Sequence, residues 1–355
     1  MKPVLFVTGN VPGYRVEGLR LLHEREGLEL ATFGGRSLHG GPAGPDDGLP
    51  IPSRTVAPRE LLGLAASGGY RAVVVSTAGR TAPLAAWAGA RRAGVPVVLW
   101  ASLWAHPRSP AQMLGYPALR RLYGSANAVV TYGPHVSAYV AARGAHNVHV
   151  APQNVDNAFW SAPASGEALP EGWPSDASTR FLFVGRDAPE KGLDVLRRAF
   201  RRARERAPGI ALVLAGGAHG EGPGTLSLGT VGRERLRDVY AACEVLVLPS
   251  IATRTFREPW GLVVNEAMNQ RLAVIASDAV GAAAGGLVKD GENGLVVPAG
   301  DVAALSGAIE RLAGDPQLRA KMGVRGAENV RGYTAGAWAE GFTAALASLG
   351  LARDR

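Results

Sequence analysis

Short β-branched runs alternate with helix-type patterns along the whole chain, and this alternation most constrains its fold. In the first half, strand-like runs lie near residues 3–8, 28–33, 72–76, 95–101, 128–132 and 148–151. Helix-type patterns lie between them, near residues 15–26, 82–93, 112–123 and 135–143. This order is typical of a parallel sheet with crossover helices on both faces. The first half therefore predicts a doubly wound α/β domain.

The second half repeats this rhythm. Strand-like runs lie near residues 181–185, 211–215, 226–228, 245–248, 274–276 and 295–297, and helix-type patterns near 191–207, 234–242, 259–269, 302–313 and 316–329. A polar stretch rich in Pro, Gly and Ser, residues 158–178, is interpreted as the interdomain linker. A chain of 355 residues exceeds the size at which one core usually keeps growing. We therefore expect two domains, residues 1–156 and 157–335, with a ligand cleft at the carboxyl ends of both sheets.

The net charge of +8 is carried by the first half. Residues 1–155 hold 15 Lys and Arg against 7 Asp and Glu, and from residue 61 to 155 there are eight arginines and no acidic residue. An arginine-rich coding bias would explain this. So would an anionic partner, such as a phosphorylated acceptor or an acidic membrane surface. The arginines form no basic stripe interleaved with aromatic residues, so nucleic acid is not an expected partner.

Cysteine usage and hydropathy bear on the compartment. The single cysteine, Cys243, excludes an intramolecular disulfide and agrees with a reducing cytoplasm. No apolar run approaches the roughly 18–20 residues that span a bilayer, and the N-terminal run is too short for a signal peptide. We expect a cytoplasmic protein, with peripheral contact to the inner membrane face as an option. The helix at 112–123, with Leu114, Leu119, Arg120 and Arg121, could lie on an anionic membrane, but packing on the core is the favoured interpretation.

The segment REPWGLVVNEA, residues 257–267, holds two glutamates eight positions apart. Glu258 precedes a predicted helix with Pro259 at its first position, where proline is favoured. Glu266 would then lie roughly 10–12 Å further along the helix axis. Backbone amides near Gly261 and Leu262 would bind a diphosphate, with one carboxylate on sugar hydroxyls and the other on a ribose. The alternative is a surface helix that happens to carry two glutamates.

The segment FVGRDAPEKG, residues 183–192, joins a strand end at Gly185 to a helix predicted from about residue 189. Asp187 and Glu190 have the spacing of a capping box. Arg186 and Lys191 flank the helix start, where the macrodipole disfavours cations. Such a local conflict suggests a function, here binding a diphosphate and stabilising the charge that develops as it leaves. Solvated charges at a helix end are the alternative.

These two motifs, Gly-Arg-x4-Lys-Gly and Glu-x7-Glu, resemble those of the retaining glycosyltransferases of family 4. The similarity continues through residues 152–156, 245–250, 273–278 and 290–298, and it covers about residues 150–335. The resemblance implies the GT-B fold, with two doubly wound Rossmann-like domains facing a central cleft. It also implies an N-terminal acceptor domain, a C-terminal nucleotide-sugar domain, and a last helix, 336–350, that packs back on the N-terminal domain.

The resemblance also implies residue roles. Glu258 would contact the donor sugar, Glu266 the ribose, and Arg186 with Lys191 the diphosphate. The other donor-binding positions that it implies are Gly13, Gly185, Val231, Trp260, Gly261, Leu262 and Val263. Gly13 lies in the loop that approaches the donor phosphate in such enzymes, although it could merely shape a turn, and Val231 lies near the expected nucleobase.

The chain departs from the family pattern at several positions, two of which concern expected site residues. Trp260 stands where many relatives have phenylalanine, a mild exchange. A histidine that often follows the strand at 95–101 is replaced by Ser102, and His106 follows four residues later. His106 could assist the acceptor or the sugar, or could be an ordinary loop histidine, which is the favoured interpretation. No Asp-x-Asp motif occurs, so cations and a helix start, and not a metal, are expected to hold the donor.

The expected function is metal-independent, retaining transfer of a sugar from a nucleoside diphosphate sugar to an acceptor hydroxyl. The catalytic candidates are Glu258, Lys191, Arg186 and His106, and no cofactor is expected beyond the donor as co-substrate. A hydrolase or epimerase of the same fold and a non-catalytic nucleotide-sugar-binding protein are the alternatives.

Overall fold

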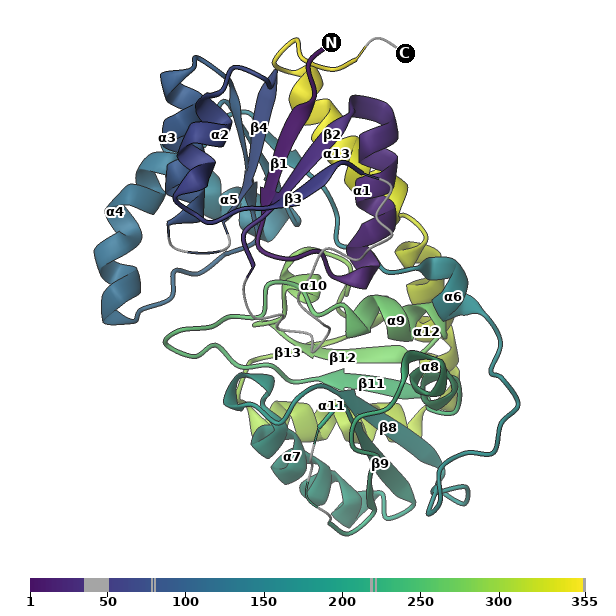
Figure 1. The fold of residues 1–355 in the computed structure, drawn as a ribbon. Coiled ribbons are helices and arrows are strands. Elements are labelled where there is room, and N and C mark those ends of the chain that lie inside the picture. Colours follow the sequence, from purple (N-terminus) through teal and green to yellow (C-terminus); the bar gives the residue numbers. More distant parts are fainter. Residues whose placement is uncertain (35–50, 78, 80, 218–219, 221, 354–355) are drawn as a thin grey trace. The chain divides into compact units, whose positions relative to one another are not determined.

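The computed structural model describes residues 1–34, 51–77, 79, 81–217, 220 and 222–353. The chain divides into two compact units, residues 1–154 with 334–355, and residues 155–333. The backbone therefore passes between the units twice, after Asn154 and after Tyr333 (Figure 1).

The stretch 158–178, expected to be the linker, belongs to the second unit, which corrects that interpretation. It begins within helix α6 (Asn157–Ser161), whose Trp160 is buried. The Gln270 amide donates hydrogen bonds to the carbonyls of Trp160, at 2.5 Å, and Ala162, at 2.8 Å. A polar composition suggested a free connection, but one buried aromatic ring and two hydrogen bonds from the Gln270 side chain fix its first residues to the unit.

The first unit contains a sheet of seven parallel strands in the order β3-β2-β1-β4-β5-β6-β7. Their bounds are β1 Val4–Thr8, β2 Leu28–Thr32, β3 Ser53–Thr55, β4 Ala72–Ser76, β5 Val97–Ala101, β6 Ala128–Thr131 and β7 Val148–Val150. The strand β1 is buried at every position, as its unbroken apolar run predicts for a central parallel strand. The edge strand β3 was not predicted, because its three residues are exposed and carry no apolar pattern.

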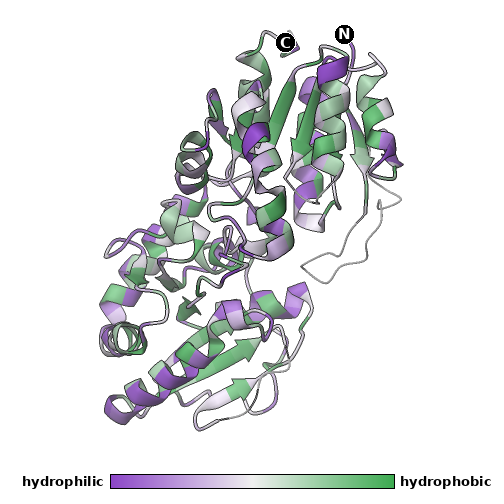
Figure 2. Cartoon of the chain, turned by 90° about the vertical axis from the view of Figure 1, so that its left-hand side faces the viewer, coloured by the Kyte–Doolittle hydropathy of each residue, from purple (hydrophilic) through white to green (hydrophobic). Residues whose placement is uncertain are grey.

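Helices cover both faces of this sheet because successive strand residues point to opposite sides. Phe6 and Val74 face α1 (Gly13–Glu26) and α13 (Ala335–Ala347). Leu5 and Val73 face α2 (Glu60–Ala66) and α3 (Ala82–Arg92). Further along this second face, Leu99 packs with α4 (Pro110–Ser125) and α5 (Pro134–Ala141). Hydrophobic residues accordingly fill the strands, while the helices carry polar residues as well (Figure 2).

The last helix, α13, completes the core of the first unit. Its Trp338 and Phe342 pack against Phe6 of β1, with ring centroids 6.3 and 5.5 Å from that ring. Gly18 of α1 permits this contact, because a Cβ there would lie 2.8 Å from the Trp338 ring. Gly341 likewise lies against the carbonyl of Val150, at the end of β7. The C-terminal helix is thus a structural part of the first unit.

The second unit contains six parallel strands in the order β10-β9-β8-β11-β12-β13. Their bounds are β8 Thr179–Val184, β9 Ile210–Ala215, β10 Thr225–Ser227, β11 Val245–Leu248, β12 Ala273–Ser277 and β13 Gly294–Val297. The helical elements besides α6 are η1 Pro189–Lys191, α7 Leu193–Arg206, α8 Arg233–Ala241, α9 Val263–Asn269, α10 Gly281–Ala284, α11 Val302–Gly314 and α12 Pro316–Val330. Phe181, Leu212 and Val245 of the sheet pack with Phe200 of α7 and Ile309 of α11. The predicted class, α/β with two parallel sheets, is confirmed.

Across the residues that the structure describes, no helix is long and apolar enough to cross a bilayer.

Candidate functional site

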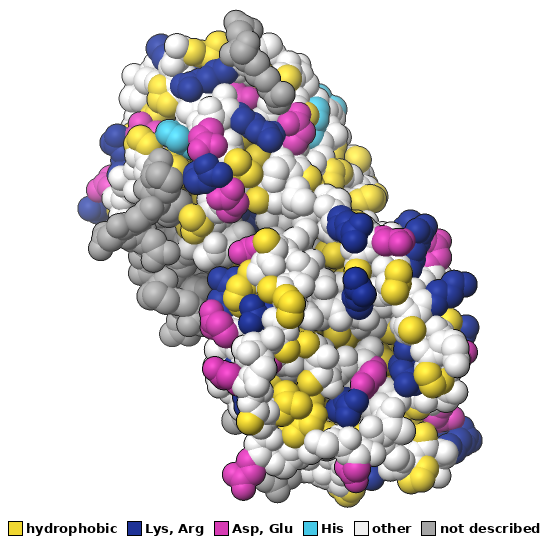
Figure 3. All heavy atoms as spheres, turned by 90° about the vertical axis from the view of Figure 1, so that its right-hand side faces the viewer, with side chains coloured by type: hydrophobic (Ala, Val, Ile, Leu, Met, Phe, Trp, Pro, Cys, Tyr) yellow, Lys and Arg dark blue, Asp and Glu magenta, His cyan; other side chains and the backbone are white. Residues whose placement is uncertain are grey.

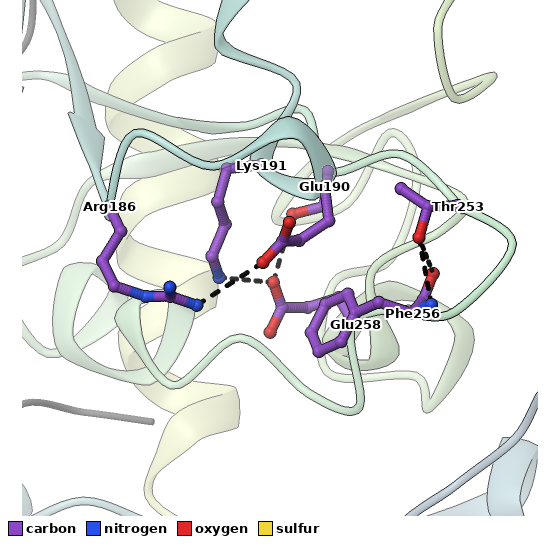
Figure 4. Close-up of polar contacts among 7 residues, drawn as sticks. Arg186, Glu190, Lys191, Thr253, Phe256 and Glu258 are labelled. Carbon is purple, nitrogen blue, oxygen red and sulfur yellow. Dashed lines mark hydrogen bonds and ion pairs between the residues drawn. The ribbon is translucent and has the colours of Figure 1, made fainter. Parts of the chain in front are cut away.

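A buried ion pair lies at the carboxyl edge of the second sheet. The Lys191 ammonium nitrogen lies 2.5 Å from Glu258 Oε2, and the Ser250 hydroxyl donates to the same oxygen at 3.3 Å. Lys191 follows β8 and Ser250 follows β11, which is the neighbour of β8 in the sheet. Parallel strands end at one edge, so segments distant in sequence meet there. Figure 4 shows the Lys191 and Glu258 side chains pointing toward each other.

Backbone geometry places Lys191. Gly192 has a φ of 68°, and a Cβ on it would lie 2.1 Å from the Pro249 carbonyl oxygen, so only glycine fits against the end of β11. The Ile251 amide donates to the Glu190 carbonyl at 2.9 Å, which joins the turn η1 to the segment after β11. The expected capping box is wrong, because Ala188 precedes this turn without a side-chain cap and α7 begins only at Leu193.

The loop that carries Glu258 is held by the start of α10. The Gly281 amide donates to the Glu258 carbonyl at 3.1 Å, and the Ala282 amide donates to the Trp260 carbonyl at 2.8 Å. A Cβ on Gly281 would lie 2.0 Å from the Pro259 carbonyl oxygen, so this approach also requires glycine. These contacts, with a parallel bridge between Glu258 and Val280, hold residues 258–260 outside the helix.

The predicted helix start at residue 259 is therefore wrong. Gly261 has a left-handed φ of 93°, and α9 begins at Val263 and has seven residues. Glu258 and Glu266 do not share one helix, so the rise per residue does not give their separation. The sequence suggested otherwise because proline favours first helical positions, but here the hydrogen bonds to α10 decide the backbone.

Glu266 is half-buried on α9 and accepts a hydrogen bond from the Tyr240 hydroxyl at 2.8 Å. Removal from water raises the pKa of Glu266 to about 7, against the opposing effects of this hydrogen bond and of Arg233. Tyr240 on α8 was missed by sequence reasoning, because a buried tyrosine in an amphipathic helix gives no signal for its partner.

Arg186 lies beside the ion pair and is more loosely held. Its side chain is 55% exposed, and its guanidinium lies 3.4 Å from Glu190 Oε1. Figure 4 shows Arg186, Glu190, Lys191 and Glu258 converging on one region. An exposed ion pair of this kind contributes little, so Arg186 can change partners at small cost when an anion arrives.

The loops after β8, β9 and β10 lie against one another. The Gly185 amide donates to the Ala215 carbonyl at 2.9 Å, and the Gly216 amide donates to the Gly229 carbonyl at 2.7 Å. A Cβ on Gly216 would lie 3.0 Å from the Gly185 carbonyl oxygen. Val231, half-buried, follows in the loop before α8. Gly185 and Val231 therefore lie at the same sheet edge as the ion pair.

The start of α9 holds the remaining predicted positions. The Trp260 indole is buried, donates to Asn265 Oδ1 at 2.8 Å and packs on the Tyr333 ring. Its side chain thus supports the loop from within the core of the unit. Leu262 and Val263 are half-buried at the first positions of the helix.

Gly13 and His106 belong to the first unit. Gly13 is the first residue of α1, lacks a left-handed φ, and would meet no atom within 4 Å if it carried a Cβ. Neither turn geometry nor packing requires glycine there. The His106 Nε2 lies 3.0 Å from the Gln112 carbonyl, and its ring packs on Tyr116 with centroids 4.3 Å apart. These contacts favour a role for His106 in fixing the start of α4.

The part of the chain that the structure describes contains no group of three or more His, Cys, Asp or Glu side chains placed to hold a metal ion.

Comparison with known proteins assigns this region to a family. Residues 170–329 match the family model described as glycosyl transferases group 1. These residues are similar to a group 1 glycosyltransferase domain. The matched range contains the Lys191–Glu258 pair, Arg186 and Glu266, and it covers less than half of the chain.

Curated relatives match over part of the chain. A D-inositol 3-phosphate glycosyltransferase of Streptomyces griseus is 34% identical over 226 residues, which cover 55% of this chain and 46% of that protein. An alpha-D-kanosaminyltransferase of Streptomyces kanamyceticus is 31% identical over 153 residues, 40% of this chain and 38% of that one. The match thus spans less than half of the length of each of these relatives.

Solved structures share the fold across both units. Anabaena HepE, in complex with UDP and glucose, superposes with a TM-score of 0.71 at 17% identity and covers 98% of this chain and 100% of its own. Sucrose-phosphate synthase from Thermosynechococcus elongatus gives 0.73 at 19% identity, with 99% of each chain covered. The predicted GT-B fold, with two Rossmann-like domains, is confirmed.

Proposed function

We propose that this protein is a glycosyltransferase that moves a sugar from a nucleoside diphosphate sugar to an acceptor hydroxyl, with retention at the anomeric carbon and without a metal ion. The observation that carries the proposal is the pairing of Lys191 with Glu258 within the group 1 glycosyltransferase domain. At this sheet edge the Lys191 ammonium can stabilise the leaving phosphate, and the Glu258 carboxylate can bind the sugar.

In this proposal the donor diphosphate lies beside Lys191, Arg186 and the backbone at Gly185, and backbone amides around Gly261 add hydrogen bonds. The bond between the anomeric carbon and the phosphate oxygen breaks, and the acceptor oxygen bonds to that carbon. The acceptor proton leaves with the nucleoside diphosphate. The two cations stabilise the negative charge that develops on the leaving phosphate, which is where electrostatic catalysis is most effective.

Glu258 would accept hydrogen bonds from the sugar hydroxyls, and Lys191 holds its carboxylate in place before the donor binds. Glu266 would accept from the ribose, oriented by Tyr240. Val231 and its loop would lie along the nucleobase. Gly13, where the protein itself does not require glycine, is proposed to let the donor phosphate approach the backbone closely.

The acceptor is proposed to be anionic or lipid-linked and to bind the first unit. The excess of arginine over acidic residues between 61 and 155 supports an anionic acceptor. The phosphorylated inositol in the name of the Streptomyces griseus relative points to the same class of molecule.

Donor binding can be tested by thermal unfolding with uridine, guanosine, thymidine and adenosine diphosphates and their sugars. A true donor at 100 times its Kd should stabilise the protein by about 2.7 kcal/mol. UDP-sugars come first, because HepE was solved with UDP. Sugar release at an equal rate without any acceptor would instead indicate a hydrolase. Stabilisation by a nucleotide sugar without turnover across acceptor classes would indicate a binding protein.

A further inference from the structure

The first half of α4 presents apolar side chains to solvent. Leu114 is 85% exposed and Met113 is 50% exposed. The second half is anchored, because Leu122 and Tyr123 are buried in the core beside β5 and β6. The expectation that this helix packs on the core is therefore correct for its last turns only.

The exposed half is nonetheless held in a defined position. The Ser109 side chain caps the helix by accepting from the Gln112 amide, and Pro110 occupies the first helical position. His106 binds the Gln112 carbonyl and packs on Tyr116. Met113 and Leu114 are thus displayed by an ordered helix start.

Arginines without acidic partners accompany these apolar residues. Arg108, Arg120 and Arg121 are exposed, and no ion pair forms to any of them within the described ranges. No Asp or Glu occurs anywhere from residue 61 to 155.

The α1 and α13 helices of the same unit differ in this respect. There Arg20 pairs with Glu17 and Glu24, and Arg25 pairs with Glu340. In the view of Figure 3, basic and acidic side chains accordingly lie next to one another. The absence of acidic residues is therefore a property of residues 61–155, which include α4, and not of the unit as a whole.

We propose that the exposed half of α4 docks this protein on a lipid bilayer with anionic headgroups. Met113 and Leu114 would enter the boundary between headgroups and acyl chains, and the three arginines would contact lipid phosphates. A protein partner fits less well, because stable interfaces bury about 800 Å² on each side, whereas the apolar part here consists of two large side chains. A bilayer needs no larger complementary surface.

This docking goes beyond sugar transfer and does not depend on it. Each arginine brought to an anionic surface raises membrane partition roughly fivefold, so three arginines and two apolar side chains predict weak, reversible binding. Such binding would depend on lipid charge and on salt.

The test is sedimentation of the full chain with vesicles of phosphatidylcholine alone or with 30% phosphatidylglycerol. We expect binding to the anionic vesicles only, a loss of at least tenfold for Leu114→Glu, and a loss of about twentyfold for the double variant Arg120→Gln, Arg121→Gln. The matched control is Leu62→Glu on α2, a 45% exposed leucine of the same unit, which changes the net charge equally and should bind like the unaltered protein.

Equal loss for Leu62→Glu and Leu114→Glu would overturn the proposal, because charge alone would then explain it. Equal binding of Leu114→Glu and the unaltered protein would also overturn it. So would concentration-dependent dimerisation that Leu114→Glu abolishes in the absence of vesicles, since the occupant would then be a second copy. An unchanged thermal midpoint of each variant shows that folding is not the cause.

Discussion

For the Lys191–Glu258 pair we predict that removing both charges restores much of the stability lost on removing one, but not the rate of sugar transfer. The two side chains are only 16% and 9% exposed, so removal of either partner leaves a largely buried charge. Breaking such a pair costs about 3–5 kcal/mol when burial is complete. Partial access to water and the hydrogen bond from Ser250 reduce this, so Lys191→Met and Glu258→Gln should each lower the free energy of unfolding by about 2 kcal/mol.

The double variant should be more stable than the sum of the singles predicts. With both charges removed, no unpaired ion remains, and the loss should be about 1 kcal/mol. The coupling free energy between the two positions is then about 3 kcal/mol, at the upper end for residues in contact. Urea unfolding followed by tryptophan fluorescence measures all four proteins, provided that the m-values agree.

The rate of sugar transfer should stay low in the double variant, although its stability partly recovers. If the pair serves the donor, each single variant and the double variant should lose at least a hundredfold in kcat, because removing one electrostatic group from an active site costs about 10²–10³. A double variant that regains most of the transfer rate would refute the reasoning, since the pair would then be only a scaffold. Purely additive stability effects would refute the coupling itself.

Three further predictions concern single positions. Because burial raises the pKa of Glu266 to about 7, the unfolded chain ionises first as pH rises from 4.5 to 7. The free energy of unfolding should therefore fall across that window, by about 1–2 kcal/mol once partial exposure of Glu266 is allowed for. Urea titrations at several pH values measure this fall, and Glu266→Gln should abolish it. If the variant shows the same dependence of unfolding free energy on pH, other groups cause it. Gly261→Ala places a Cβ 2.7 Å from Leu248 at a φ of 93° and should lower the free energy of unfolding by about 2–3 kcal/mol. Calorimetry should show a larger loss in the free energy of donor binding. A variant as stable as the unaltered protein would show that the backbone at residue 261 is not strained by a side chain. His106→Ala removes the contact to the Gln112 carbonyl and should lower the free energy of unfolding by about 1 kcal/mol, with kcat within threefold of the unaltered protein. A hundredfold fall in kcat would instead indicate that His106 is catalytic.

Strands were predicted from the sequence within about two residues, because buried parallel strands are apolar runs with clear ends. The edge strand Ser53–Thr55 lacks such a run and was missed. The start of α9 was misplaced for another reason. Pro259 is a local helix signal, but its neighbours form hydrogen bonds to residues 281 and 282, and no local rule contains that information.

The sequence predicted which residues form the candidate site, but it did not predict which of them contact one another. The motifs singled out Lys191 and Glu258, yet these lie 67 positions apart, and only the adjacency of β8 and β11 joins them. Tyr240 had no signal of its own, and Ser250 appeared only as the end of the similar segment 245–250, because the role of each consists of one hydrogen bond to a glutamate.

The return of α13 to the first unit has a consequence for the order of events during synthesis. Residues 1–154 leave the ribosome without Trp338, Phe342 and Leu346, which complete their core. On the apolar face beside β1, α1 lacks its neighbour α13 until the whole second unit has been translated. The core of the first unit can therefore be completed only after the second unit has been synthesised, although domains usually fold from the N-terminus onward.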